Sequence, residues 1–165
     1  MRSARSHDFT GLHQRGFALV EFVITAPVLL LIMFGSFEFS NFLQEYSRLN
    51  DAVNDAASWA AIQALQGSDG VLATGTAWNT LVTQTQNMVV YGNAAGSGSP
   101  LLPSLNTGQV SVQANTTGNS NTVTVSVSYP YISLFGGAAI PDFGGGWGSL
   151  STSYNLNISA TMEAI

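Results

Sequence analysis

The chain has 165 residues with no cysteine and no lysine, and only 8% of the residues are charged. Without cysteine, a disulfide framework and a thiolate metal site are both excluded. A nucleic-acid-binding protein needs a basic face to meet phosphates, so the four arginines and the net charge of −5 argue against that class. The length suits one small domain with an additional element.

Residues 1–16 differ in charge from the rest of the chain. They contain three of the four arginines, Arg2, Arg5 and Arg15, against a single acid, Asp8. The remainder holds only Arg48 against eight acidic residues. Positive charge next to an apolar segment stays on the cytoplasmic side of a membrane. We therefore expect the N-terminus in the cytoplasm and the C-terminal part outside it.

An apolar run begins at Phe17. Phe17 to Phe34 is 18 residues with one carboxylate, which makes a helix of about 27 Å, close to the hydrocarbon thickness of a bilayer. A cleaved secretory signal would end in a small-residue cleavage site. The run is followed instead by FEFSNFLQEYSRL, which contains large residues, so a cleaved secretory signal fits poorly. An uncleaved, single-pass membrane anchor remains as an alternative.

Two residues inside this run are unusual for a lipid-facing helix. Glu21 is the fifth residue of the run, and a carboxylate in such a segment costs about 2.5–3.5 kcal/mol on insertion scales. Pro27 lacks an N–H and cannot bond the Val23 carbonyl, which predicts a kink or a locally opened turn. Glu21 therefore needs a functional explanation.

Helical periodicity continues beyond the apolar run. Neither proline nor glycine occurs between Asn41 and Leu65, and the apolar positions follow a spacing of three, four and seven. We expect one helix over residues 17–66, with Gly67 as the residue after its end. Glu38, Glu45 and Arg48 are interpreted as solvated side chains of this helix, Glu45 and Arg48 as an exposed pair.

From residue 67 the pattern changes to a small α+β head. A short helix is expected at about 77–90, bounded by Thr76 and Gly92. Alternating residues at 110–114 and 123–129, separated by TTGNSN, predict a β-hairpin. SYNLNISATME alternates again and predicts a third strand. The fold class is therefore α+β, with a long N-terminal helix, a short second helix and a three-stranded antiparallel sheet.

The string RGFALVEFVITAPVLLLIMFGSFEF carries a family resemblance. A basic leader that ends in glycine, followed by an apolar helix with glutamate at its fifth position, resembles a type IV prepilin. Val20-Glu21-Phe22, Pro27 and Phe34-Gly35 are similar to the TadE-like pseudopilins of the tight-adherence secretion system. The pattern Val-Ser-Tyr-Pro-Tyr, a loop and a final Ser-Ala-Thr-Met-Glu resembles their C-terminal part less specifically.

This resemblance implies a function and a set of partners. A prepilin peptidase would cut between Gly16 and Phe17, which makes residues 1–16 a cytoplasmic leader, 17–66 the transmembrane and assembly helix, and 67–165 a periplasmic head. The mature chain would be a minor pilin or pseudopilin that joins or primes a type IVb pilus for surface attachment. Its partners would be other pilins, the assembly platform and the bacterial inner membrane.

The resemblance also suggests a role for Glu21. Cleavage would leave a charged α-amino group on Phe17, and Glu21 of a neighbouring subunit could neutralise it. At 4 Å and an effective dielectric constant of 20, two such charges attract by about 4 kcal/mol. The pairing would also fix the register between subunits. The alternative without a functional role is that Glu21 lies at the level of the lipid headgroups and stays hydrated.

Nothing in the sequence predicts catalysis. The two histidines, His7 and His13, lie in the expected leader, and the acids of the head are isolated along the chain. The glycine-rich GGGWG at 144–148 does not connect a strand to a helix, so it does not match a phosphate-binding loop. We expect a protein without enzymatic activity, cofactor or metal.

Overall fold

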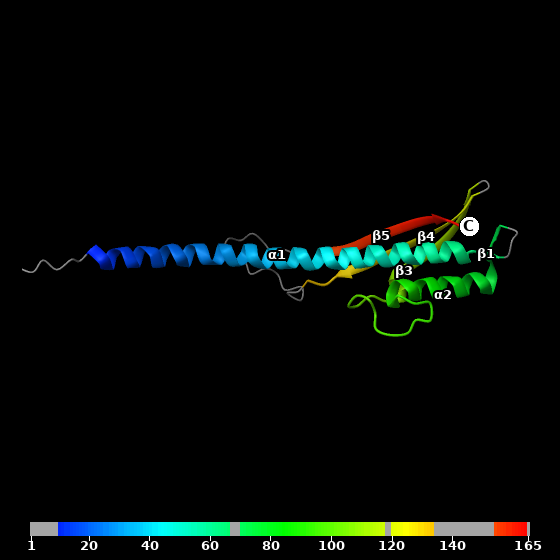
Figure 1. Ribbon diagram of the computed structural model, residues 1–165, viewed down its shortest axis with the longest axis horizontal. Coiled ribbons are helices and arrows are strands. Elements are labelled where there is room, and N and C mark those ends of the chain that lie inside the picture. Colours follow the sequence, from blue (N-terminus) through cyan, green and yellow to red (C-terminus); the bar gives the residue numbers. More distant parts are fainter. Residues whose placement is uncertain (1–9, 67–69, 118–119, 134–153, 165) are drawn as a thin grey trace, which may run out of the picture. The chain divides into compact units, whose positions relative to one another are not determined.

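The computed structural model of the chain describes residues 10–66, 70–117, 120–133 and 154–164. For residues 10–16 it describes the backbone only. It divides into two compact units, residues 1–40 and residues 41–165. The elements follow in the order α1, β1, β2, α2, a 3-10 turn, β3, β4 and β5 (Figure 1). The predicted α+β class is confirmed.

The first element, α1, is an α-helix over Thr10–Gln63 with Pro27 inside it. It begins seven residues before the expected start, so the Gly16–Phe17 junction lies within the helix. It ends earlier than residue 66, because Leu65 and Gln66 form strand β1 and pair antiparallel with β2, Val71–Leu72. The Ala73 N–H donates to the Ala64 carbonyl at 2.7 Å and closes this small hairpin. Gly67 lies outside the described residues.

The predicted second helix is α2, Gly75–Tyr91. It ends at Gly92, which has a left-handed backbone (φ 74°) and donates its N–H to the Met88 carbonyl at 2.9 Å. Glycine adopts this conformation without steric penalty, and it stops the helix. A loop follows that buries Leu102 and Leu105, and the 3-10 turn Thr107–Gln109 leads into the sheet.

The sheet has three antiparallel strands in the order β3-β4-β5. β3 is Val110–Thr117, β4 is Ser120–Tyr131 and β5 is Tyr154–Glu163. The register runs from Val110↔Val127 to Thr117↔Ser120, and from Thr122↔Glu163 to Tyr131↔Tyr154. Pro130 is tolerated in the central strand because β3 pairs with β4 only as far as Val127. Beyond that residue β5 alone pairs with β4, so one edge of β4 needs no N–H donor at Pro130. The predicted turn at Gly118-Asn119 lies outside the described residues.

The core of the second unit lies between the helices and one face of the sheet. β4 alternates buried and partly exposed residues along almost its whole length, as a half-buried strand requires. Small residues of α1 fill this core together with larger residues from α2 and from the loop after it. The α1 residues in this core are Leu49, Val53, Ala56, Ala57, Ala60 and Ala64.

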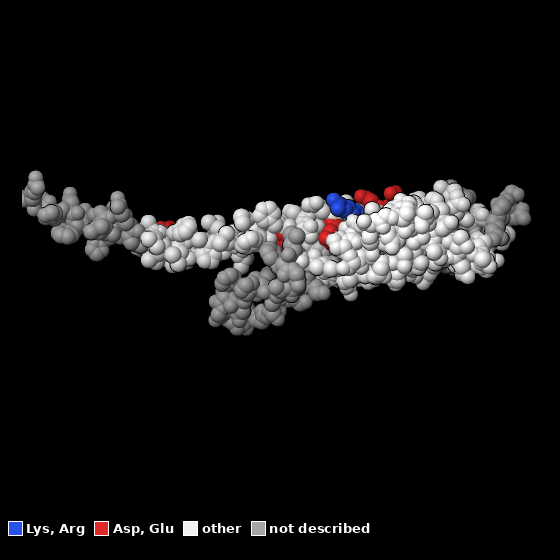
Figure 2. All heavy atoms as spheres, turned by 90° about the horizontal axis from the view of Figure 1, so that it is seen from below, with Lys and Arg blue, Asp and Glu red and all other residues white. Residues whose placement is uncertain are grey.

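The outer face of the sheet is formed by hydroxyl and amide side chains. Thr124 and Thr161 are joined through their Oγ1 atoms at 2.9 Å, and the Ser126 Oγ donates to the Ser159 Oγ at 3.2 Å. Few charged residues lie on the face of the molecule that Figure 2 shows, where most of the described residues are drawn in white. This face is mainly polar and uncharged, with Glu163 at the end of β5 as a carboxylate on it.

Candidate processing and assembly segment

The first part of α1 exposes apolar side chains on all sides. The span that begins at Phe17 has an 18-residue window with a mean hydropathy of 2.5, and none of that window is buried within the chain. A soluble helix would bury one apolar stripe against a core. This helix is therefore long and apolar enough to cross a membrane. Its exposed large apolar residues include Phe17, Leu19, Val20, Phe22, Val23, Ile24, Val28, Leu29, Leu30, Leu31, Ile32, Met33, Phe34, Phe37 and Phe39.

The hydroxyl groups of this segment are satisfied by the helix itself. The Thr25 Oγ1 donates to the Glu21 carbonyl at 2.9 Å, the Ser36 Oγ to the Ile32 carbonyl at 2.8 Å, and the Ser40 Oγ to the Ser36 carbonyl at 2.9 Å. Such bonds let serine and threonine enter an apolar environment without a lost hydrogen bond. The side chain of Glu21 in the same segment is a different case, because a carboxylate has no hydrogen to donate to a helix carbonyl.

Glu21 lies on the exposed surface of α1, one helical turn after Phe17. Within the part of the chain that the structure describes, its carboxylate forms no hydrogen bond or ion pair. Phe17 is 76% exposed. Among the described residues Glu21 thus has no partner, and it lies in an apolar segment, where an unpaired charge is costly. A group of this kind is available for an interaction with another molecule.

The remaining predicted residues also lie on α1. Gly16 joins Phe17 inside the helix, and Pro27 is a helical residue ten positions further on. The helix continues through Pro27, so the proline does not end it; the predicted kink stays a prediction. Gly35 has no atom within 4 Å of the place where a Cβ would be. The packing of the chain on itself therefore does not explain this glycine, which costs a helix about 1 kcal/mol relative to alanine.

Sequence reasoning placed Glu45 wrongly. Glu45 was expected on a solvated face beside Arg48, whereas it is half-buried and bonded to the head. Its Oε2 accepts from the Tyr129 hydroxyl at 3.1 Å, and its Oε1 accepts from the Asn41 Nδ2 at 3.4 Å. The available signal was spacing, because residue 45 lies one turn before Leu49 on the buried stripe.

Tyr129 connects this carboxylate to the loop before the sheet. Its side chain is fully buried, and its hydroxyl also lies 2.8 Å from the Pro103 carbonyl oxygen, an acceptor. Burial raises the pKa of Tyr129, and the charge of Glu45 raises it further. The Asn41 Nδ2 donates to the Tyr131 hydroxyl at 3.2 Å, and the rings of Phe42 and Tyr131 meet edge to face at 5.3 Å. These contacts fix one end of the sheet to α1.

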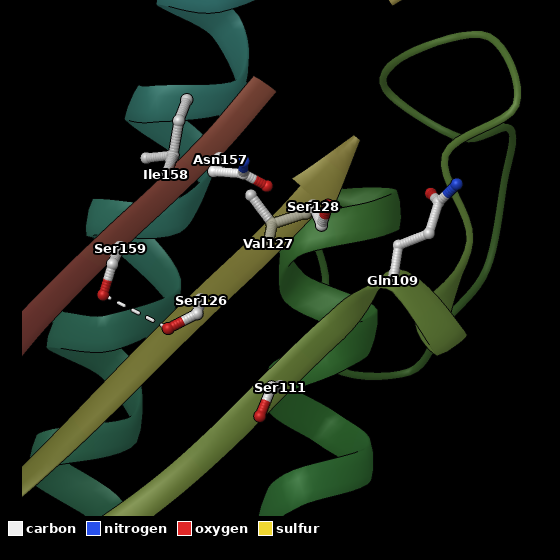
Figure 3. Close-up of a pocket in the computed structure, with 8 residues that line it drawn as sticks. All are labelled: Gln109, Ser111, Ser126, Val127, Ser128, Asn157, Ile158 and Ser159. Carbon is white, nitrogen blue, oxygen red and sulfur yellow. Dashed lines mark hydrogen bonds between the residues drawn. The ribbon is translucent and has the colours of Figure 1, made fainter. Parts of the chain in front are cut away.

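A shallow hollow of about 370 Å³ lies on the outer face of the sheet (Figure 3). Six of its eight lining residues are polar, and among them the Ser126 Oγ donates to the Ser159 Oγ. The lining residues contain neither histidine nor carboxylate, the groups that general acid–base chemistry uses. Nor do the described residues contain a cluster of three or more groups that could hold a metal ion. The lining consists of Gln109, Ser111, Ser126, Val127, Ser128, Asn157, Ile158 and Ser159.

The comparison with protein families gives a match over the first part of the chain. Residues 16–58 match the family model described as TadE-like protein. The matched segment includes Gly16, Phe17, Glu21 and Pro27, and it extends into the part of α1 that packs on the sheet. No match was found among curated proteins or among solved structures. The resemblance to TadE-like proteins seen in the sequence is thereby confirmed over residues 16–58.

Proposed function

We propose that the chain is a minor pilin or pseudopilin, cut by a prepilin peptidase between Gly16 and Phe17 and then built into, or used to prime, a tight-adherence type IVb pilus for surface attachment. The match to TadE-like protein supports an association with this pilus system. The observation that carries the proposal is the segment around Glu21. It is an unburied apolar helix whose carboxylate, one turn after Phe17, has no partner among the described residues.

The proposed role of the segment follows from its charges. Cleavage creates an α-amino group on Phe17, charged near neutral pH. Its attraction to Glu21 of a neighbouring subunit is worth about 4 kcal/mol at 4 Å and an effective dielectric constant of 20. Neither group then stays unpaired in the helix bundle. The open space at Gly35 is compatible with close approach of a second helix, since small residues favour such contacts.

The proposed location is the bacterial inner membrane, with residues 1–16 in the cytoplasm and the head in the periplasm. One apolar helix near the N-terminus is compatible with a single-pass membrane protein. The arginines before Phe17 support the orientation, because cationic residues are retained on the cytoplasmic side. Incorporation of the head into an extracellular pilus belongs to the same proposal.

The processing step is tested by the mass and first residue of the protein purified from membranes. We expect the chain to begin at Phe17, and Gly16→Phe to keep its leader because the bulky side chain blocks the cleavage site. Gly11→Phe is the matched control, since residue 11 is also a glycine in the helical leader. An intact leader on the unaltered protein would contradict the proposal and favour an uncleaved anchor that presents a binding head.

A further inference from the structure

One side of α1 within the second unit carries a stripe of exposed residues. We call it the outer stripe, and it consists of Gln44, Arg48, Asp51, Asp55, Ser58 and Ile62. These residues follow one another at intervals of four, three, four, three and four, which places them on one side of an α-helix. All six are exposed, whereas Leu49, Val53 and Ala56 on the other side belong to the core. The outer stripe is therefore a helix surface that the described residues of the head do not cover.

The outer stripe contains most of the charge that the structure describes in the second unit. Five charged side chains are described there, and Arg48, Asp51 and Asp55 are three of them. The other two are Glu45, which is bonded to the sheet, and Glu163 at the end of β5. Figure 2 shows the blue atoms of the arginine beside red acidic atoms on a head drawn mostly in white. The outer stripe thus carries both signs of charge on a head with few other charges.

These three charges have no partner among the described residues. Neither Arg48 nor the two aspartates form a side-chain hydrogen bond or an ion pair there. Arg48 precedes Asp51 by three positions, which is the less favourable order for an ion pair on a helix. Asp51 and Asp55 are four positions apart, and like charges at that spacing destabilise a helix. A cation from another molecule would relieve this repulsion.

We infer that the outer stripe binds the outer stripe of a second copy of the chain, which lies beside it in the same orientation. The inference rests on the proposed function, because one membrane then holds the N-terminal helix of every copy and gives all copies one direction. If the two stripes were level, each charge would face its like. A shift by about five residues, or about 7.5 Å of helix, brings Arg48 opposite the gap between Asp51 and Asp55 of the second copy.

The charges determine the register of this contact more than its strength. An exposed ion pair adds little affinity, whereas like charges in contact disfavour the unshifted arrangement. The aspartates of the first copy remain available for Arg48 of a third copy. The contact is therefore head to tail, and unlike a contact between identical surfaces it can repeat through an assembly.

The test uses cysteine crosslinking, since the chain has no cysteine of its own. In the shifted arrangement residue 58 of one copy lies within about 1.5 Å of residue 62 of the next, measured along the helix. Two full-length copies with different C-terminal tags are expressed together, one with Ser58→Cys and the other with Ile62→Cys. Membranes are oxidised, and the disulfide-linked product that carries both tags is measured. Thr76→Cys with Thr80→Cys is the matched control, because both threonines are exposed and have the same spacing on α2.

We expect at least ten times more product from the 58/62 pair than from the control pair. Ser58→Cys in both copies should give little product, because these residues are then about 7.5 Å apart along the helix and the Cβ atoms of a disulfide lie about 4 Å apart. Adding Arg48→Asp to the copy with Ser58→Cys should reduce the 58/62 product severalfold. Asp51→Arg together with Asp55→Arg in the other copy should restore it, which a folding defect would not allow.

A 58/62 product no greater than the control would overturn the inference, and so would a larger product from Ser58→Cys in both copies. Cysteines at 58 and 62 that neither crosslink nor react with a maleimide would overturn it too, since a different protein would then cover the outer stripe. The mass of the same membrane protein tests the proposed function separately. A chain that begins at Phe17 but gives no 58/62 product contradicts this contact alone, whereas an intact leader contradicts the processing step whatever the crosslinks report.

Discussion

Tyr129 has one hydroxyl hydrogen and two acceptors within reach, the Pro103 carbonyl oxygen at 2.8 Å and the Glu45 Oε2 at 3.1 Å. This single hydrogen cannot form a full hydrogen bond to both acceptors, and the Glu45 carboxylate has no hydrogen to donate in return. Glu45→Gln introduces an amide that can donate to the Tyr129 oxygen, which frees the hydroxyl for Pro103. We expect the free energy of unfolding to stay equal or rise.

Tyr129→Phe is the opposite change at the same place. It leaves Pro103 and Glu45 without their donor, and a buried polar group without a partner costs about 1–3 kcal/mol. Urea unfolding of both variants, followed by tryptophan fluorescence, measures the difference, since Trp59 and Trp78 pack against the core. If Glu45→Gln destabilises the head as much as Tyr129→Phe does, the shared-hydrogen explanation is wrong.

Glu21 is the second residue whose charge decides an outcome. Glu21→Ala should leave membrane insertion equal or improved, because a carboxylate leaves the apolar segment. Cleavage should persist, since the Gly16–Phe17 junction is unchanged. Association should fail, because the amine of Phe17 loses its partner and an unpaired buried charge costs about 3–5 kcal/mol.

Crosslinking to partner pilins in membranes measures this association. Glu21→Gln should fail as Glu21→Ala does, and Glu21→Asp should recover part of the signal. Glu38→Ala is the control, since it removes the other carboxylate between Phe17 and Ser40. If the Glu21→Ala protein is inserted, cleaved and crosslinked at the normal level, the charge pairing is wrong and Glu21 has no role in association.

Among the elements, the loop after α2 depends on a close approach at Gly96. A Cβ there would lie 2.7 Å from the Asn87 Nδ2, which donates to the Ala94 carbonyl. Gly96 also has a left-handed backbone (φ 69°), as does Gly70 (φ 63°), where a Cβ would meet nothing within 4 Å. Both alanine variants therefore carry the same backbone strain, of order 1 kcal/mol.

Gly96→Ala should lose more stability than Gly70→Ala, because it also displaces Asn87 and its bond. The melting temperatures of the two variants, measured by circular dichroism, give the difference directly. Equal melting temperatures would mean that Asn87 moves aside without cost.

Elements fixed by local patterns could be predicted from the sequence. The period of α2 and the glycine at its end locate that helix, and the alternation of β4 and β5 locates the strands. The end of α1 could not be found in this way. Leu65 and Gln66 would continue the helix by local preference, but they pair antiparallel with Leu72 and Val71 of β2. Pairing between separated segments overrides propensity.

The residues of the candidate segment also differ in how well the sequence alone identifies them. Glu21 stands out because its surroundings along the chain are apolar, so sequence is sufficient to select it. Glu45 was missed because its partner in the sheet, Tyr129, lies 84 positions away, and its own neighbours resemble a solvated helix face. A residue whose function comes from distant contacts gives little local signal.

For the whole molecule, orientation is the property that the charges predict. Residues 1–16 carry a net charge of +2 and the remainder −7. A reporter fused after Ile165 should be active only when it is of the kind that works in the periplasm. Replacing Arg2, Arg5 and Arg15 with asparagine should reduce that activity, because the retained positive charge is gone. Strong activity of a cytoplasm-only reporter on the unaltered chain would reverse the topology.

The last strand of the sheet has a consequence for how the head is made. β5 supplies Leu156, Ile158 and Ala160 to the core and pairs with β4 over ten positions, from Thr122↔Glu163 to Tyr131↔Tyr154. β3 and β4 are neighbours along the chain and can pair early, whereas β5 must return across the intervening segment. The sheet therefore cannot be completed until the ribosome has released residue 163. Until then the core lacks Leu156, Ile158 and Ala160, so a chain still in synthesis exposes the apolar face of β4 that these residues later help to cover.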